Sequence, residues 1–150
     1  VRSSAASDVY KRQFIAHAYA ENSSVCSAIE EERNIQGFFM AYLSMNDYYL
    51  LAPELELKHG FCDLFLMPDL QRYGDIAHSY ILELKYLPVT DFDTKADSQW
   101  KEALNQIKEY AVASRVRQLV QGTQLHCIVM QFRGWELVRM EEIPNISSNA

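Results

Sequence analysis

Hydrophobic and polar residues follow two periods along the chain, and each period predicts a different kind of element. From about Ser27 to Ser44 apolar residues recur at helical spacing, with acids in the early turns where the helix dipole favours them. This predicts an amphipathic helix, preceded from Phe14 to about Ser27 by a weaker helix and a loop. A second strong helix is predicted from about Ala96 to Ser114, because one stripe carries Trp100, Ala103, Leu104, Ile107 and Ala111.

Five other stretches have the composition of β-strands. The first is extended after Asp47 and ends in a tight turn at residues 58–60, and the others are 61–67, 78–86, 125–132 and 135–140. Residues 88–94, rich in Asp and Thr, are predicted to form a loop, and the tail from Glu141 is expected to be frayed. The predicted order is therefore helix, three strands, helix, two strands, in an α/β (α+β) domain.

The strand SYILELKY at residues 79–86 carries an acid and a lysine two positions apart. Residues two apart project from the same face of a strand, so Glu83 and Lys85 share a face with Ile81. The opposite face is continuously apolar, with Tyr80, Leu82, Leu84 and Tyr86. Charged residues on a buried strand are costly unless they are paired or functional, which makes this strand the first candidate for chemistry.

The strands at 61–67 and 78–86 predict a hairpin. If it is symmetric about Tyr73, Asp63 pairs with Glu83, and directly opposed residues have Cβ atoms about 5 Å apart. The same symmetry places Asp69 opposite position 77, far from Glu83. Asp63 and Glu83 are therefore expected to be neighbours.

Two close carboxylates repel each other when both are ionised, and a shared proton or a hard cation resolves the repulsion. We expect Mg²⁺, with Mn²⁺ as an alternative, held by Asp63, Glu83 and Glu56. Lys85 would lie beside the metal, where it could orient or help deprotonate an attacking water and offset transition-state charge. Glu54 is interpreted as a surface or edge charge farther from Asp63. The reaction implied is metal-assisted phosphodiester hydrolysis.

Composition narrows the setting of this chemistry. The 150 residues are 49% hydrophobic and 12% aromatic, as expected for one folded domain, and show neither a membrane-spanning run nor a signal peptide. We expect a soluble, cytoplasmic protein with no membrane partner. The net charge of −6 argues against a DNA coat or architectural protein but leaves room for an enzyme with a local basic groove. The three cysteines are interpreted as reduced core residues and the four histidines as structural or surface residues.

The start of the chain is expected to be foreign to the protein. SSAASDVYKRQ, at residues 3–13, is similar to the translation of a sequencing-library adapter, so residues 1–13 are interpreted as an artefact. The domain then occupies residues 14–150, and we expect it to be the C-terminal part of a longer protein.

Asp63 followed by Glu83-Leu84-Lys85 on paired strands, between two helices, resembles the PD-(D/E)XK nuclease superfamily. The resemblance runs from about Glu31 to Glu142. Three segments are similar to the branch of this superfamily found C-terminal to AAA-ATPase-like domains in bacterial proteins: YYLLAPELELKHGFCDLFLMPD, HSYILELKYL and QWKEALNQIKEY.

The resemblance implies a restriction-endonuclease-like core, with a central mixed sheet of about five strands flanked by helices. It also implies that Asp63, Glu83 and Lys85 bind the metal and position water. By the same resemblance Glu56 matches the upstream acid, Glu32 the acid on the first helix and Gln106 the glutamine on the second. The chain departs from the family name at Cys62, which stands where the proline is expected, and the literal Pro68-Asp69 is a decoy at a strand end.

Several functions stay open at this stage. The first is an active Mg²⁺-dependent nuclease acting on DNA, with specificity supplied by partner domains. The second is a nuclease-like module that has become a binding or regulatory appendage of an AAA-ATPase-like domain, which the acidic balance favours. An interaction domain of unrelated origin is the third.

Overall fold

The computed structural model describes residues 32–45, 47–57 and 60–144, together with the backbone but not the side chain of Phe61. The helix predicted for residues 14–27 lies outside the described residues, as does the interpreted artefact at residues 1–13. The helices are α3 (Glu32–Leu43), α4 (Val89–Ala111) and α5 (Ser114–Leu119). The strands are β1 (Tyr49–Leu57), β2 (Gly60–Pro68), β3 (His78–Leu87), β4 (Gln124–Arg133) and β5 (Glu136–Ile143).

The five strands form one mixed sheet in the order β1-β2-β3-β4-β5. β3 and β4 are parallel, and the other neighbouring pairs are antiparallel. A parallel pair needs a long crossover connection, which α4 and α5 supply. The predicted α+β fold, a mixed five-stranded sheet with flanking helices, is confirmed.

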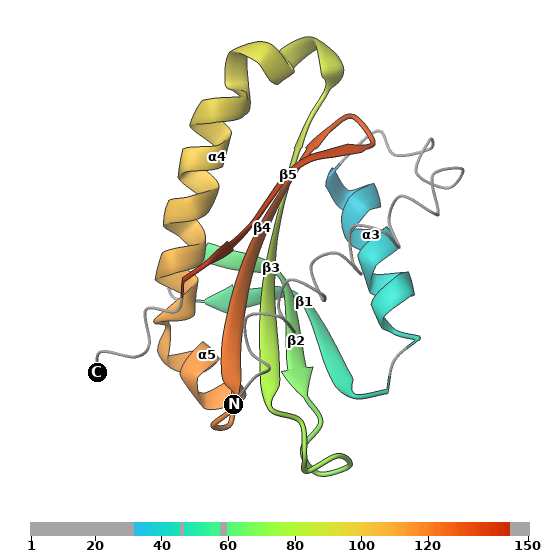
Figure 1. Cartoon of the computed structure of the whole chain (residues 1–150), viewed down its shortest axis with the longest axis vertical. Helices are drawn as coiled ribbons and strands as arrows, with labels where there is room; N and C mark the ends of the chain where they lie inside the picture. Colours follow the sequence, from blue (N-terminus) through green and yellow to red (C-terminus); the bar gives the residue numbers. More distant parts are fainter. Residues whose placement is uncertain (1–31, 46, 58–59, 145–150) are drawn as a thin grey trace, which may run out of the picture.

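The helices cover opposite faces of the sheet (Figure 1), and each face has its own apolar core. The core on the α4 side includes Phe65, Ile81 and Val129 from the strands and Trp100, Ala103 and Ile107 from α4. The core on the α3 side includes Leu64, Leu82, Leu84 and Met130 from the strands and Ile35 and Phe39 from α3. β3 therefore contributes to both cores, with alternate residues on each side as its sequence predicts.

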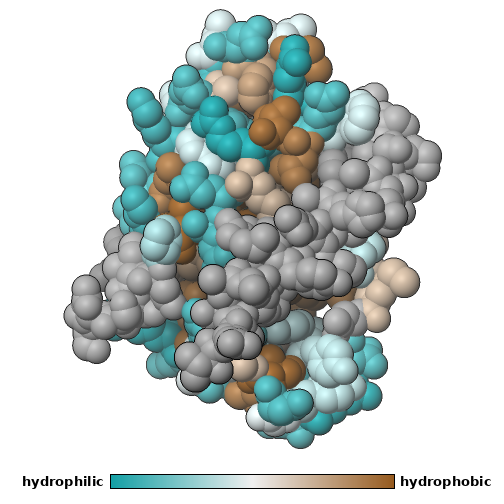
Figure 2. Space-filling model, in the orientation of Figure 1, coloured by the Kyte–Doolittle hydropathy of each residue, from teal (hydrophilic) through white to brown (hydrophobic). Residues whose placement is uncertain are grey.

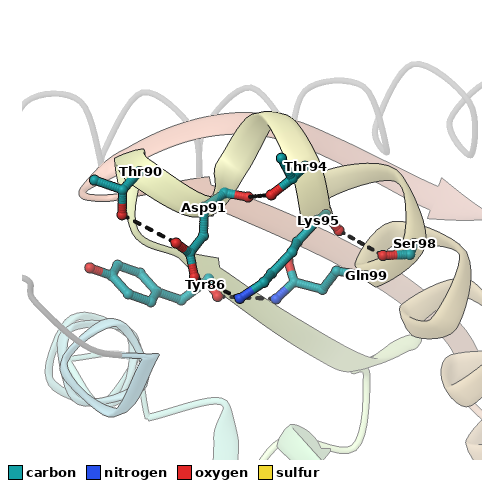
Figure 3. Close-up of polar contacts among 7 residues, drawn as sticks. All are labelled: Tyr86, Thr90, Asp91, Thr94, Lys95, Ser98 and Gln99. Carbon is teal, nitrogen blue, oxygen red and sulfur yellow. Dashed lines mark hydrogen bonds and ion pairs between the residues drawn. The ribbon is translucent and has the colours of Figure 1, made fainter.

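The loop predicted at residues 88–94 was wrong, because α4 begins at Val89. The first turns are stabilised by polar contacts instead of apolar packing (Figure 3): Lys95 pairs with Asp91 at 2.7 Å, and the Thr94 hydroxyl bonds the Asp91 carbonyl at 3.1 Å. Asp91 also lies in the first turn, where the helix dipole favours an acid. These turns are largely exposed, and their apolar residues, Val89 and Phe92, are set among Asp and Thr residues that are typical of a loop.

Two other boundaries differ from the predictions. The second helix ends at Ala111, and residues 114–119 form the separate helix α5. The last strand continues to Ile143, whereas the tail from Glu141 was expected to be frayed. Ile143 pairs with Cys127 and is buried in the α4-side core, so packing of this one apolar residue extends the strand.

Exposed polar residues line the outer side of α4, and Figure 2 shows the resulting hydrophilic margin. Among the described helices, none is both long and apolar enough to cross a lipid bilayer. Cys62 and Cys127 are free and buried, as predicted, and burial raises the pKa of both thiols. Cys26 lies outside the described residues.

Candidate active site

Asp63 lies one residue beyond the paired part of the β2–β3 hairpin. The ladder between these strands contains three pairs, all symmetric about Tyr73: Leu64 with Leu82, Phe65 with Ile81, and Leu66 with Tyr80. The next step of this register joins positions 63 and 83. The predicted register of the hairpin is therefore confirmed.

Asp63 stands at an interruption of the sheet. The β2–β3 ladder ends at Leu64. In the β1–β2 ladder, the pair formed by Glu54 and Asp63 is missing between two regular pairs. Glu54 has a left-handed backbone with φ of 49°, which is uncommon for a residue with a side chain and bends the strand locally. In place of a strand carbonyl, the Asp63 carboxylate accepts the Leu84 N–H through Oδ2 at 2.7 Å. At this interruption the carboxylate of Asp63 is partly buried and is held in place by its hydrogen bond with Leu84.

Glu83 and Lys85 form an ion pair on the α4-side face of β3. The Lys85 Nζ lies 2.9 Å from Glu83 Oε1, and the Glu83 side chain is only 1% exposed. The second oxygen of Glu83, Oε2, is buried with no hydrogen-bond partner among the described residues. Burial, with the negative charge of Asp63 in second place, raises the pKa of Glu83 to about 7, although Lys85 opposes the rise. Glu83 is a carboxylate that one lysine does not fully stabilise.

Two further acids share this electrostatic environment. Burial raises the pKa of Asp63, against the opposing effects of the Leu84 hydrogen bond and the Lys85 charge. Burial and the Asp63 charge likewise raise the pKa of Glu32, in the first turn of α3, and Lys85 opposes that shift. Burial alone would lower the pKa of Lys85, but the charges of Glu83, Asp63 and Glu32 together raise it above its ordinary value. The structure therefore brings Glu32, Asp63, Glu83 and Lys85 within mutual electrostatic influence.

A cavity of about 420 Å³ opens beside Asp63. Its lining comes from α3 and from three strands: Glu32, Arg33, Gln36, Glu54, Asp63 and Leu84. Glu83 and Lys85 are not part of this lining, so Asp63 is the member of the candidate site that meets the cavity directly. Three carboxylates and one guanidinium give the cavity an acidic character.

The structure corrects the sequence-based interpretation of the two acids on β1. Glu54 was placed farther from Asp63, but the β1–β2 register puts it opposite Asp63, and its charge contributes to the raised pKa of Asp63. Glu56, predicted as a metal ligand, lies opposite Phe61 and is exposed, and it does not line the cavity. The difference arises because the pairing of Leu57 with Gly60 sets the register of the whole β1–β2 hairpin.

Sequence reasoning also missed Arg33 and Gln36. Both lie one turn or less from Glu32, and Gln36 donates from Nε2 to the Asp63 carbonyl at 2.8 Å. The only available signal was the i, i+4 spacing of Glu32 and Gln36, which puts both side chains on the same side of a helix.

Gln106 lies on α4, partly buried, and its Oε1 is buried without a hydrogen-bond partner among the described residues. Tyr110, one turn later, belongs to the α4-side core. Burial, followed by the Glu83 charge, raises the pKa of Tyr110 to about 12, which places Tyr110 near the acids. Gln106 therefore lies one helical turn from Tyr110, which interacts electrostatically with Glu83.

His78 and His126 form a separate network. Their rings share a hydrogen bond of 2.8 Å between Nδ1 and Nε2, and His126 Nδ1 bonds Glu142 at 2.6 Å. These contacts join β3, β4 and β5, as expected for structural histidines. His17 and His59 lie outside the described residues.

The donor set at Asp63 and Glu83 fits a hard divalent cation. Mg²⁺ is typically held by one or two carboxylates together with waters and substrate phosphates, so a complete protein cage is not required. The described residues contain no group of three or more His, Cys, Asp or Glu side chains arranged to hold a metal ion, so the predicted set of Asp63, Glu83 and Glu56 is not found as a three-carboxylate group. A bound cation would give the unpartnered Oε2 of Glu83 a ligand and would lower the raised pKa values of the carboxyl groups.

Comparison with known families agrees with this geometry. A family model described as the PD-(D/E)XK nuclease superfamily matches residues 30–142. The chain belongs to this superfamily. No curated protein and no solved structure is significantly similar to the chain.

Membership of the PD-(D/E)XK superfamily supports phosphodiester hydrolysis as the class of reaction. The matched range contains α3, β1, the β2–β3 hairpin and α4, from which all the candidate side chains come. The mixed sheet with flanking helices is consistent with the restriction-endonuclease-like fold expected of a PD-(D/E)XK protein.

Proposed function

We propose that this chain is a Mg²⁺-dependent nuclease that cleaves DNA, with Asp63, Glu83 and Lys85 as its catalytic residues. One arrangement carries the proposal: the Asp63 carboxylate accepts the N–H of Leu84, the residue between Glu83 and Lys85, and the Lys85 ammonium lies 2.9 Å from Glu83. Two carboxylates and an ammonium at an interruption of the sheet are the groups that metal-assisted hydrolysis of a phosphodiester requires.

Asp63 and Glu83 would hold the divalent cation, with Mn²⁺ as a substitute for Mg²⁺. When bound, the cation supplies Lewis-acid polarisation of the phosphate and lowers the pKa of its water. Asp63 keeps a fixed orientation because its Oδ2 accepts the Leu84 N–H. Glu83 has one oxygen engaged with Lys85 and the other, Oε2, available within the buried site.

Lys85 is suited to act as a cation and less suited to act as a base. Its pKa is raised by the surrounding carboxylates, so the ammonium form persists at neutral pH. An ammonium donates hydrogen bonds to a nearby water or to phosphate oxygens and offsets the charge that develops as the P–O bond breaks. We therefore assign water orientation and charge stabilisation to Lys85.

Glu32 and Gln106 are supporting residues in this proposal. Glu32 lines the cavity and interacts electrostatically with Asp63 and Lys85, so it can hold a water of the cation's shell. Gln106 has an unpartnered buried Oε1 that can accept a hydrogen bond from water or substrate.

A second candidate function is a catalytically silent, nuclease-like module attached to an AAA-ATPase-like domain. The observation that favours it is charge: the chain carries −6, and the cavity lining holds three carboxylates against one arginine. Such a surface repels the DNA backbone unless a bound cation or a partner domain compensates for it. Both candidates are compatible with a cytoplasmic protein.

The discriminating experiment incubates the purified chain with supercoiled plasmid, linear duplex and single-stranded DNA, with Mg²⁺, Mn²⁺ or EDTA. We expect cutting that depends on the metal and that falls roughly 10³-fold or more in Glu83→Gln and Lys85→Met. Glu102→Gln and Lys101→Met, on the exposed side of α4, are the matched controls. A wild-type chain that binds Mn²⁺ and DNA without cutting, alone or joined to an AAA-ATPase-like domain, would support the silent module instead.

A further inference from the structure

We propose that Gln36 is a positioning residue that holds Asp63 in the orientation needed to bind the cation. The proposal deepens the nuclease function and rests on it where metal binding is concerned. Its structural basis is a hydrogen bond of 2.8 Å from Gln36 Nε2 to the Asp63 backbone carbonyl, which joins residues 27 positions apart in the chain.

The Asp63 carbonyl is accessible to a side chain because the sheet is interrupted at this residue. The β2–β3 ladder ends at Leu64, and the β1–β2 ladder contains no pair for Asp63. A buried backbone carbonyl without a partner is costly, so a residue at this point needs a hydrogen bond from outside the ladders. Gln36 supplies that bond.

The position of Gln36 is set by strong apolar anchors. Ile35 and Phe39 of α3 are 0% and 1% exposed and pack in the same core as Leu64 and Leu84, which flank Asp63 and Glu83 in sequence. With the helix fixed at these two points, its side that carries Glu32 and Gln36 faces the cavity beside Asp63. The donor is therefore held by a packed helix and not by a flexible loop.

Asp63 is consequently held by two hydrogen bonds, one from α3 to its backbone carbonyl and one from β3 to its carboxylate. Its carbonyl accepts from Gln36 of α3, and its carboxylate Oδ2 accepts from the Leu84 backbone of β3. Loss of the Gln36 bond frees the peptide of Asp63 to rotate and weakens the bond to Leu84. Partners that orient a metal-binding carboxylate typically change metal affinity by roughly 10- to 100-fold when they are removed.

A merely structural role for Gln36 makes a different prediction. If the amide only satisfies a buried carbonyl, its loss lowers global stability and leaves the local geometry of the folded site unchanged. The two roles separate when the Leu84 amide and the metal affinity are measured in the folded protein.

The experiment uses Gln36→Met, which keeps the length of the side chain and removes its donor. Gln121→Ala is the control, since Gln121 Nε2 also bonds a backbone carbonyl, that of Leu119, on the exposed surface. Hydrogen exchange of the Leu84 amide is measured in the metal-free protein at a pH where both proteins are folded. Mn²⁺ affinity is measured by calorimetry, and DNA cutting at saturating Mn²⁺ is followed separately.

In Gln36→Met we expect Leu84 exchange at least about 10-fold faster, with core amides such as that of Leu82 unchanged, and Mn²⁺ affinity roughly 10- to 100-fold weaker. Unchanged Leu84 exchange, or faster exchange of all core amides together, overturns the proposal. If wild type neither binds Mn²⁺ nor cuts DNA, the proposed function fails, while the Leu84 exchange still decides whether Gln36 holds Asp63.

Discussion

The Lys85 ammonium lies 2.9 Å from the Glu83 carboxylate, yet this pair leaves the site short of positive charge. Asp63 and Glu32 also act electrostatically on Lys85, so three carboxylates share one ammonium. Protons or a divalent cation would compensate for the excess of negative charge on these three carboxylates. This imbalance underlies the first three predictions below.

The pH dependence of stability should carry the signature of Glu83. Its pKa rises from 4.5 to about 7 on folding, so between these values the folded state binds a proton that the unfolded state has released. Stability contributed by this group is thus present below pH 4.5 and is lost as pH rises to about 7. At 1.36 kcal/mol per pKa unit the loss is about 3 kcal/mol.

Glu83→Gln tests this assignment, because glutamine cannot ionise. We expect the variant to gain stability relative to wild type at pH 8 and to gain none at pH 4.5, as measured by urea unfolding without metal. Glu102→Gln, at an exposed position, should show no such difference. An equal effect of Glu83→Gln at both pH values would contradict the prediction.

Removal of Lys85 should raise the pKa of Glu83 further. Lys85 lowers the Glu83 pKa by charge and by hydrogen bonding, so Lys85→Met leaves the buried carboxylate with only the effects that raise its pKa: burial and the charges of Asp63 and Glu32. Carbon-13 NMR titration of the Glu83 carboxyl measures the shift, which we expect to be upward from about 7. Because Glu83 can neutralise itself by taking up a proton, the loss of stability should stay near 1–3 kcal/mol. Lys101→Met serves as the control, and a lowered Glu83 pKa would refute the assignment.

Glu54 and Glu56 should differ in their effect on Asp63. The charge of Glu54 contributes to the raised pKa of Asp63, whereas Glu56 makes no comparable contribution and lies opposite Phe61. We expect Glu54→Gln to lower the pKa of Asp63 and Glu56→Gln to leave it unchanged, as read from the carboxyl chemical shift of Asp63 across a titration. The reverse order would restore Glu56 as the acid that accompanies Asp63.

Substitution of Gly60, in the β1–β2 hairpin, should destabilise the protein. Its φ is 143°, and a Cβ there would lie 3.0 Å from the Tyr110 hydroxyl. Gly60→Ala therefore combines backbone strain with a close contact, and we expect a loss of about 1–3 kcal/mol in urea unfolding. Gly122 has φ of 79° but open space around it, so Gly122→Ala isolates the strain and should cost about 1 kcal/mol. Equal losses would show that the Tyr110 contact yields without cost.

Much of the fold is local information in the sequence. The alternation of SYILELKY places Ile81 and Leu82 in opposite cores, and the symmetry of the hairpin about Tyr73 sets Asp63 against Glu83. Both results follow from the two-residue period of a strand and from turn length. The start of α4 was missed because Thr90, Asp91 and Thr94, which stabilise it by polar contacts, are also residues typical of loops.

The surroundings of the acids depend on contacts between distant segments. The sequence predicted the Asp63, Glu83 and Lys85 constellation, because all three residues lie on one hairpin with a symmetric turn. It could not predict that Glu54 and not Glu56 faces Asp63, since a shift of pairing by two residues would put Glu56 opposite Asp63 and leave the composition unchanged.

By itself, then, the sequence determined which strands form, which faces they bury and which acid opposes Glu83. Only the tertiary structure decided that the sheet is interrupted at Asp63, that Gln36 of α3 bonds its carbonyl and that Leu84 bonds its carboxylate. The physical reason is the distance along the chain between the interacting residues. Periodicity and turn symmetry depend on residues close in sequence, whereas the hydrogen bond from Gln36 to Asp63 joins residues 27 positions apart and requires α3 to pack against the sheet.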